Sequence, residues 1–317
     1  MNRLITLIIL SLLFFACSKE DTIKFAVFSD AHNDIIHDAK IRLELFIEAA
    51  EKKDVDFIIE LGDFCLPFDI NQPFLKIWNS FNGSSYHVLG NHDIDVSPKI
   101  VTQQFLGMDR SYYSFDKGDF HFIVLDANFI KNENEYIPYS RGNYFNHSEN
   151  RPYIPGNQLE WLKKDIAQTN NYIIIFSHQS LEHWGGVKNR EKLREIFNDA
   201  NKERKKVIAC FCGHDHEDRY AEIDGIHYIG IRSLSFNWVG EKYQYEKRFP
   251  SELNELYPNL KYTMPYRDPL YAFIELDPEG RIMIIGKQST FIPPDPRQLG
   301  ISNTLNYPKI TSRKLEF

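Results

Sequence analysis

Five short apolar runs in this chain each end in a cluster of Asp, Asn and His residues. The runs with their clusters are IKFAVFSDAH (23–32), VDFIIELGD (55–63), SYHVLGNHD (85–93), YIIIFSH (172–178) and KVIACFCGHDH (206–216). Helical patterns separate the first three runs, and this alternation predicts βαβ units with parallel strands. Because ligands of such sheets collect at the carboxyl ends of the strands, we expect the five clusters to meet at one sheet edge.

The rest of the pattern predicts one mixed α/β domain over residues 23–290, followed by a tail at 291–317 that packs on it. Amphipathic periodicity predicts helices at 36–53, near 73–81, at 157–168 and at about 188–201. Turn signals between apolar stretches predict hairpins around Lys117-Gly118, Asp224-Gly225 and Glu279-Gly280. The first half of the domain is therefore expected to be parallel and the second half rich in hairpins.

Two long insertions, at about 129–156 and 236–269, interrupt this domain. Loops longer than about 12 to 15 residues in a compact domain are usually functional or disordered. Their content of Tyr, Trp, Asn and Arg favours ordered contact with a ring or a polar head group, and the alternative is that they only roof the sheet. Candidate substrate-binding residues, for a phosphate or a base, are Arg141, Asn143 and Tyr144, with His183 near the fourth cluster.

The first 17 residues have the pattern of a secretory signal. Arg3 precedes an apolar run from about Leu7 to Phe15, which is shorter than the roughly 20 residues of a membrane-spanning helix. Ala16 and Cys17 at its end resemble a bacterial lipoprotein signal, with Cys17 lipidated and residues 18–22 serving as a tether. We expect an exported lipoprotein anchored to the bacterial cell envelope. A plain signal peptide or an N-terminal anchor is the alternative.

The overall charge restricts the classes of partner. The formal net charge is −7, with a sequence pI of about 5.9 and no run of Lys or Arg. Duplex DNA is therefore a poor default partner, and no nucleic acid is expected. A small phosphorylated ligand remains compatible with this balance, and we expect a monomer. Without Cys17 three cysteines remain, an odd number that indicates no disulfide framework.

The stretch ACFCGHDHEDR, at residues 209–219, allows two interpretations. Cys210, Cys212, His214 and His216 could together form a closed structural zinc site. Alternatively, the two histidines contribute to a metal site whose other ligands lie far upstream, and the cysteines only belong to a strand. The other clusters favour the second interpretation, because Asp-x-His and His-x-His each place two donors about 6 to 7 Å apart on one side of an extended segment.

The ordered series Asp-x-His, Gly-Asp, Gly-Asn-His-Asp, a lone His and Gly-His-x-His resembles the calcineurin-like metallophosphoesterases over roughly residues 23–235. The resemblance implies two mixed β-sheets packed as a sandwich with flanking helices. It also implies two di- or trivalent metal ions, which would be manganese, iron or zinc. By position, Asp30, His32 and His216 would bind the first ion; Asn91, His178 and His214 would bind the second; Asp63 would bridge both.

The resemblance further implies the hydrolysis of a small phosphomonoester or phosphodiester, including nucleotide-derived ones, by a metal-bridging hydroxide. Asp63 and His92 would be the catalytic residues, with His92 near the leaving group, where both Asn91 and His92 could contact substrate. Asp93 would orient neighbouring groups. The alternatives are a nuclease with the same catalytic core and a non-enzymatic surface lipoprotein that retains the fold.

The chain departs from the family pattern at two places. SHQS, at residues 177–180, replaces the commoner Gly-His-x-Pro, so only His178 is carried over from it. Many members carry a second Asp three residues after Gly-Asp, where this chain has Leu66. Asp69 is the nearest substitute in the sequence for supporting His92.

Overall fold

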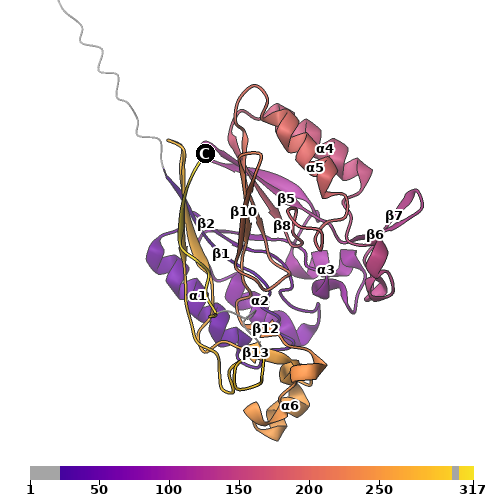
Figure 1. Ribbon diagram of the computed structural model, residues 1–317, viewed down its shortest axis with the longest axis vertical. Helices are drawn as coiled ribbons and strands as arrows, with labels where there is room; N and C mark the ends of the chain where they lie inside the picture. Colours follow the sequence, from indigo (N-terminus) through magenta and orange to yellow (C-terminus); the bar gives the residue numbers. More distant parts are fainter. Residues whose placement is uncertain (1–21, 302–306) are drawn as a thin grey trace, which may run out of the picture.

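Two six-stranded sheets pack face to face in the computed structural model, which describes residues 22–301 and 307–317 (Figure 1). The first sheet, in spatial order, contains β16 (Arg313–Glu316), β15 (Arg281–Gly286), β14 (Ala272–Asp277), β1 (Ile23–Phe28), β2 (Phe57–Glu60) and β3 (Ser84–His87). The second contains β10 (Arg219–Ile223), β11 (Ile226–Gly230), β9 (Val207–Cys212), β8 (Tyr172–Ser177), β5 (Phe120–Leu125) and β4 (Tyr113–Lys117). The predicted mixed α/β sandwich is confirmed.

In the second sheet, parallel strands form the centre and antiparallel pairs form both edges, whereas the first sheet has a parallel half and an antiparallel half that meet at the β1–β14 pair. β1, β2 and β3 are parallel neighbours, as are β5, β8, β9 and β11. The predicted hairpins are present as β4–β5, β10–β11 and β14–β15. The last described residues form β16, which pairs with β15 in an antiparallel register and so adds the tail to the first sheet.

Alternating side chains divide the apolar interior into three layers. Phe25 and Phe57 face the second sheet, where they stack at 4.8 Å between ring centroids. Phe28, on the other face of β1, packs against Phe46 of α1 and Trp78 of α2. This period of two is what a strand buried on both faces requires. Each fully buried phenylalanine stabilises the fold by roughly 1.5–3 kcal/mol.

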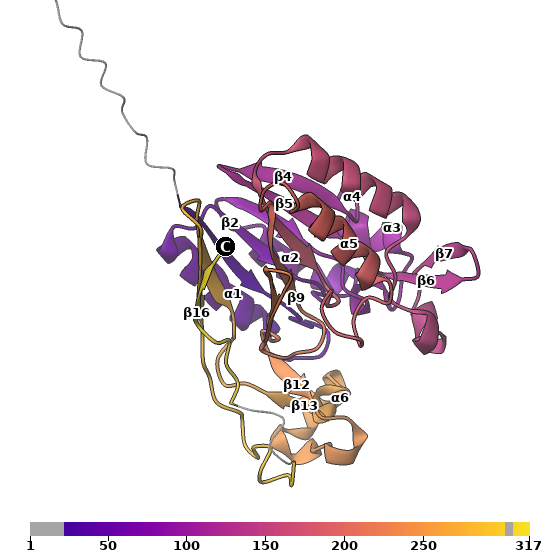
Figure 2. The same cartoon turned by 45° about the horizontal axis from the view of Figure 1, so that its top comes forward.

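Helices cover the outer face of both sheets (Figure 2). α1 (Ala39–Lys53) and α2 (Gln72–Trp78) pack on the first sheet, and α4 (Gly156–Gln168) and α5 (Arg190–Ala200) pack on the second. These correspond to the four predicted helices, although α1 begins three residues later than expected. The short helix α3 (Lys99–Leu106) was not predicted.

Both insertions are ordered and carry secondary structure of their own. The first contains the hairpin β6 (Phe129–Asn132) and β7 (Glu135–Pro138) and the 3₁₀ turn η3 (Asn143–Asn146). The second contains the pair β12 (Phe236–Trp238) and β13 (Thr263–Pro265), the helix α6 (Ser251–Leu256) and three 3₁₀ turns. β12, β13 and α6 gather at one end of the molecule, in orange in Figure 2.

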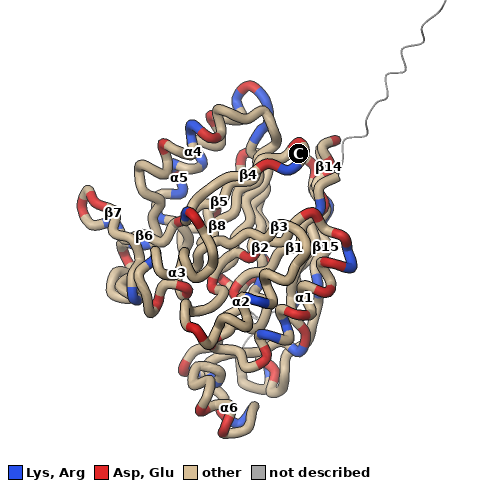
Figure 3. The backbone as a smooth tube through the Cα atoms, turned by 180° about the vertical axis from the view of Figure 1, so that it is seen from behind, with Lys and Arg blue, Asp and Glu red and all other residues tan. Residues whose placement is uncertain are grey.

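The expected signal sequence and Cys17 lie outside the described residues. Within the described part of the chain, no helix is both long and apolar enough to cross a bilayer. Acidic and basic residues are interspersed along the helices, and Figure 3 shows no continuous basic stripe on the face it presents.

Candidate metal centre

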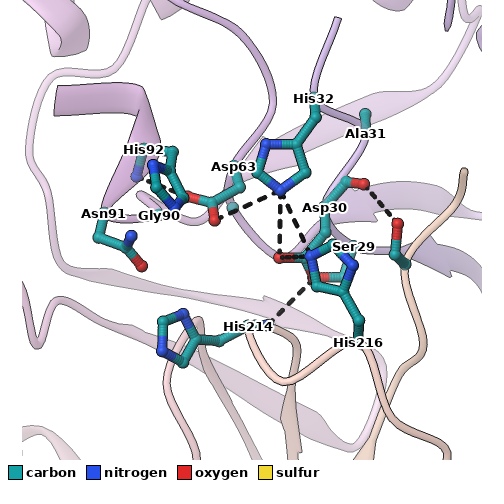
Figure 4. Close-up of polar contacts among 12 residues, drawn as sticks. Ser29, Asp30, Ala31, His32, Asp63, Gly90, Asn91, His92, His214 and His216 are labelled. Carbon is teal, nitrogen blue, oxygen red and sulfur yellow. Dashed lines mark hydrogen bonds and ion pairs between the residues drawn. The ribbon is translucent and has the colours of Figure 1, made fainter. Parts of the chain in front are cut away.

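The five predicted clusters meet where the carboxyl ends of both sheets adjoin. Figure 4 shows residues of four of these clusters. Asp30, Asp63 and Asn91 follow β1, β2 and β3 of the first sheet, and His178 and the His214–His216 segment follow β8 and β9 of the second. The expectation of a single sheet edge was wrong in this respect. Two sheets contribute because face-to-face packing aligns the ends of their parallel strands. We call these seven residues the metal centre: Asp30, His32, Asp63, Asn91, His178, His214 and His216.

The backbone at the metal centre is held in an unusual conformation. Among the described residues, nine non-glycine residues have positive φ, and five of them are Asp30, His32, Asp63, His214 and His216. The left-handed region is sparsely populated by residues with a Cβ, and each such residue costs on the order of 1–3 kcal/mol. The surrounding structure must therefore hold these five side chains in place.

Glycines in the motifs allow the loops to approach each other closely. A Cβ on Gly90 would lie 2.1 Å from the backbone nitrogen of Asp63, and a Cβ on Gly213 would lie 1.7 Å from Oγ of Ser29. No side chain fits at either position. The glycines of Gly-Asn-His-Asp and Gly-His-x-His are thus needed to bring the loops together.

A first group of three buried donors surrounds one point. The ligand atoms of Asp30, His32 and His216 all lie within 4.8 Å of one another. Oδ1 of Asp30 lies 3.3 Å from Nε2 of His216 and 3.9 Å from Nε2 of His32. Nδ1 of His216 donates a 2.8 Å hydrogen bond to the carbonyl of Phe236, so its Nε2 is free to face the group.

A second group consists of Asp63, His178 and His214, whose ligand atoms meet the same 4.8 Å limit. Nδ1 of His178 donates to the carbonyl of Leu61 at 2.7 Å, which turns its Nε2 toward Oδ2 of Asp63 at 3.2 Å. Oδ1 of Asn91 lies 3.2 Å from the same Nε2. Asn91 therefore joins the second group through its amide oxygen.

Asp63 lies between the two groups. Its Oδ2 is 3.2 Å from His178 in the second group and 3.7 Å from His32 in the first. One carboxylate that contacts both groups is the arrangement needed to hold two cations at a short separation. The structure thus brings the seven residues together in two groups, and their binding of metal ions stays a prediction.

Burial and mutual charge shift the pKa values in this centre. Burial opposes the ionised form of Asp30, but the neighbouring His216 outweighs it and lowers the pKa of Asp30 to about 2. Burial lowers the pKa of His32 to about 3. Burial also acts against protonated His178, yet the Asp63 carboxylate raises the pKa of His178 to about 10. A bound cation would take the place of that proton, because an imidazole ligand must be neutral.

His92 lies beside the first group and has a carboxylate partner that was not predicted. Nδ1 of His92 donates to Oδ2 of Asp95 at 2.7 Å, and the His92 ring lies 5.5 Å from the ring of His32. Burial would lower the pKa of His92, but Asp63 and Asp95 together raise it to about 9. Asp69, which the sequence offered as support for His92, instead lies exposed at the start of a 3₁₀ turn.

The signal for Asp95 was its spacing from His92. Residues His92–Ile94 form the 3₁₀ turn η2, and side chains three positions apart lie on the same side of such a turn. The intervening Asp93 has a different task. Its carboxylate accepts hydrogen bonds from the backbone N–H groups of Asp63, Phe64, Cys65 and Gly90, at 2.7 to 3.2 Å. Asp93 thus fixes the loop that carries Asp63 against the loop that carries Asn91.

A family model described as calcineurin-like phosphoesterase matches residues 23–218, which is more than half of the chain. The chain belongs to the calcineurin-like phosphoesterase family. It is a hydrolase that acts on phosphoester bonds. The family and the two groups of donors together support a divalent metal cofactor for this phosphoesterase.

Similar proteins include a manganese-dependent ADP-ribose/CDP-alcohol diphosphatase from Oryza sativa subsp. japonica. It is 25% identical over 224 residues, covering 56% of this chain and 68% of the relative. Among solved structures, a dimetal phosphatase from Danio rerio superposes with a TM-score of 0.58 at 14% identity, covering 85% of this chain and 98% of the other. GAP50, the anchor in the inner membrane complex of Plasmodium, has a TM-score of 0.53 at 15% identity, covering 93% and 89%. These two structures share the fold.

Of the four candidate substrate contacts from the loops, Tyr144 alone bonds to residues of the metal centre. Its hydroxyl accepts a 3.1 Å hydrogen bond from Nδ2 of Asn91. Asn143 bonds the backbone of its own loop at Ser140 and Pro138, and Arg141 is exposed. The phosphate or base contacts proposed for these loop residues stay predictions.

His183 is tied to the metal centre through Asp215. Its Nε2 donates to Asp215 at 2.7 Å, and its Nδ1 accepts a hydrogen bond from the backbone of Gly185. Both ring nitrogens are therefore engaged within the protein. Asp215 stands between His214 and His216 in the sequence, so His183 steadies the segment that carries them. A direct contact of His183 with substrate stays a prediction.

A cavity of about 130 Å³ opens beside the metal centre. Its lining includes His32, Asp63, His92, Asp95 and Asn259. Asn259 belongs to the second insertion, which therefore forms part of the wall. A larger cavity of about 740 Å³ lies elsewhere, between α2, α3 and β4, and contains none of the seven residues. The small cavity thus adjoins both His92 and two residues of the metal centre, His32 and Asp63.

Proposed function

We propose that this phosphoesterase hydrolyses a small, ring-bearing phosphate ester, such as a nucleotide derivative, with two divalent ions held by the seven residues of the metal centre. The observation that carries the proposal is the position of Asp63, whose carboxylate contacts both groups of donors. Manganese is the proposed metal. Support comes from the diphosphatase relative, which is named as manganese-dependent.

The side chains fit such ions. Oδ1 of Asp30 is buried and has no hydrogen-bond partner among the described residues, although it faces two imidazole nitrogens. An unpaired buried carboxylate oxygen is costly unless a cation compensates it. Mixed imidazole, carboxylate and amide donors suit manganese, iron or zinc. When bound, two such ions would neutralise the phosphate and activate water for attack on phosphorus.

His92 is the proposed proton donor to the leaving oxygen. It lies beside the first group without belonging to either group, and Asp95 holds its Nδ1. With Nδ1 engaged, Nε2 is the nitrogen left to reach the leaving group. Proton donation of this kind typically accelerates a reaction by a hundred- to ten-thousandfold.

Two exposed aromatic rings support a ring-bearing substrate. Phe145 of the first insertion is 57% exposed, and its ring lies 6.1 Å from that of His92. Trp238 of the second insertion is 37% exposed, and its ring lies 5.8 Å from that of His32. Each of the two rings thus lies beside one of the histidines His92 and His32. A base or a similar ring would stack on them, as aromatic side chains favour.

The activity is tested with purified protein and added manganese on a panel of chromogenic esters, nucleotides and nucleoside diphosphate derivatives. We expect hydrolysis of at least one ring-bearing ester, and we expect Asp63→Asn to lose both activity and bound metal. Asp69→Asn is the matched control, because Asp69 is exposed and lies outside the centre. Full activity of Asp63→Asn would contradict the mechanism. Activity confined to DNA would favour a nuclease, and failure to bind any metal would favour a non-enzymatic role.

The proposed location is the bacterial cell envelope, with Cys17 as the lipid attachment site. This rests on the apolar run before Ala16 and Cys17 in the sequence. Expression of the full chain in a bacterium with a labelled fatty acid should label the wild-type protein and not Cys17→Ser. Equal labelling of both proteins would exclude Cys17.

A further inference from the structure

Tyr144 connects the first insertion to two different parts of the phosphoesterase site. Its hydroxyl donates to Oδ1 of Asp95 at 2.5 Å and accepts from Nδ2 of Asn91 at 3.1 Å. The same oxygen lies 3.2 Å from Nδ1 of His92. Tyr144 itself is only 1% exposed, whereas His92 and Asp95 are partly exposed.

The insertion holds this hydroxyl rigidly. The Tyr144 ring packs in a small apolar cluster with Ile94, Ile130 and Tyr139, and it stacks on Tyr139 at 4.6 Å. The Arg151 guanidinium covers the ring at 4.6 Å from its centroid. Within this cluster the Tyr144 hydroxyl is the group that hydrogen-bonds the site.

The backbone of the insertion is also fixed to the segment that follows His92. The N–H of Gly142 bonds the carbonyl of Ile94, and the N–H of Arg141 bonds the carbonyl of Ser97, both at 3.2 Å. The insertion therefore cannot shift relative to η2 without breaking these bonds. A loop that only roofed the sheet would not need to place a buried hydroxyl between two functional side chains.

The Tyr144 hydroxyl fixes the orientation of the Asn91 side-chain amide. A carboxamide binds a metal through its oxygen, so its NH₂ group must point elsewhere. The Tyr144 oxygen accepts from that NH₂ group, which leaves Oδ1 directed at His178 and the second group. The opposite orientation of the amide would place Oδ1 against a hydroxyl whose one proton is already donated to Asp95.

We propose that Tyr144 is a positioning residue that orients Asn91 toward the second metal ion and Asp95 toward His92 at the same time. The proposal rests on the two-metal centre of the proposed function and adds a task for the first insertion. One hydroxyl thereby couples occupancy of the second metal position to the geometry of the proton donor. Partners of this kind around a metal ligand typically change metal affinity by 10- to 100-fold.

The test compares Tyr144→Phe with Tyr139→Phe in the otherwise unchanged chain. Both changes remove one hydroxyl from stacked neighbouring rings, and the Tyr139 hydroxyl makes no hydrogen bond to Asn91, His92 or Asp95. Manganese affinity of the metal-free proteins is measured by titration calorimetry. Magnetic coupling between the two ions is followed by electron paramagnetic resonance, and kcat and KM are determined on the best substrate.

For Tyr144→Phe we expect one of the two manganese ions to bind about 10- to 100-fold more weakly, with the coupled signal lost at limiting metal. At saturating manganese, kcat should stay reduced while KM changes less. Tyr139→Phe should match the wild type, and thermal unfolding of both metal-free variants checks that they fold. Wild-type affinities and kcat in Tyr144→Phe would overturn the proposal. Absence of manganese binding in the wild type would instead overturn the proposed two-metal function itself.

Discussion

Asp95 accepts a 2.7 Å hydrogen bond from Nδ1 of His92, three residues before it in the chain. The carboxylate fixes the orientation of the imidazole and stabilises its protonated form. Asp95→Asn keeps the size of the side chain but removes the charge, so we expect kcat to fall by about 10- to 1,000-fold with little change in metal content. Steady-state kinetics and metal analysis of the purified variant check this. A loss of metal equal to that of Asp63→Asn would contradict a role through His92.

The exposed rings of Phe145 and Trp238 should act on substrate binding rather than on chemistry. Phe145→Ala and Trp238→Ala should each raise KM for a ring-bearing ester by about 5- to 100-fold, since stacking on an aromatic side chain contributes about 1–3 kcal/mol. Glycerol phosphate, which has no ring, serves as the comparison substrate in the same assay. An equal effect on both substrates would show that the rings shape the site without contacting the organic group.

The pH dependence of stability should show the contribution of His121, which does not belong to the metal centre. Nδ1 of His121 lies 2.8 Å from Asp116 and Nε2 lies 2.9 Å from Asp165. Burial lowers the pKa of His121, but these two carboxylates outweigh it and raise the pKa above its usual value. Because the pKa of His121 is higher in the folded than in the unfolded protein, protonation of His121 stabilises the fold. This stabilisation is complete at pH values below the unfolded-state pKa of about 6.5, and it is lost as the pH rises through the folded-state pKa.

We therefore expect wild type to exceed His121→Gln in melting temperature by a larger margin at pH 6 than at pH 9. Thermal unfolding in matched buffers measures the margin. His147→Gln, at an exposed position, is the control and should show no such change between the two pH values. A margin that grew with pH would mean that His121 is stabilising as the neutral ring.

Cys210 and Cys212 should take no part in metal binding. Both lie on β9 with free thiols, and neither belongs to the two groups of donors. The double variant Cys210→Ser/Cys212→Ser should bind as much manganese or cobalt as the wild type. The cobalt-loaded wild type should lack sulfur-to-metal charge-transfer absorption. Such absorption would instead support a structural zinc site within residues 209–219.

The sequence predicted those parts of the site that depend on a ligand directly following a strand. Asp30, His32 and His178 could be found because an apolar run ends immediately before each cluster. Asp95 could not be found in this way, because its significance depends on a 3₁₀ turn that brings residue 95 back over residue 92. Tyr144 was named as a substrate contact, but its position against Asn91 depends on how a 28-residue insertion folds, which no local periodicity encodes.

Local sequence patterns also could not predict that the two sheets pack face to face. Alternating runs predicted parallel strands, and the sandwich itself came from the family resemblance. The division of Phe25 and Phe28 between opposite faces of β1 shows why. Both faces of the strand are apolar, so the sequence does not reveal whether a helix or a second sheet covers each one.

At five of the seven donors the backbone is left-handed, so the residue that would make the fold most stable differs from the residue that the site requires. At each of these positions a glycine would relieve conformational strain, yet it would remove a donor. Mutation of this centre can therefore make the metal-free protein harder to unfold while leaving it inert. Selection for thermal stability alone would tend to replace these aspartate and histidine residues by glycine. Only selection for the reaction would preserve them at positions where glycine causes the least strain.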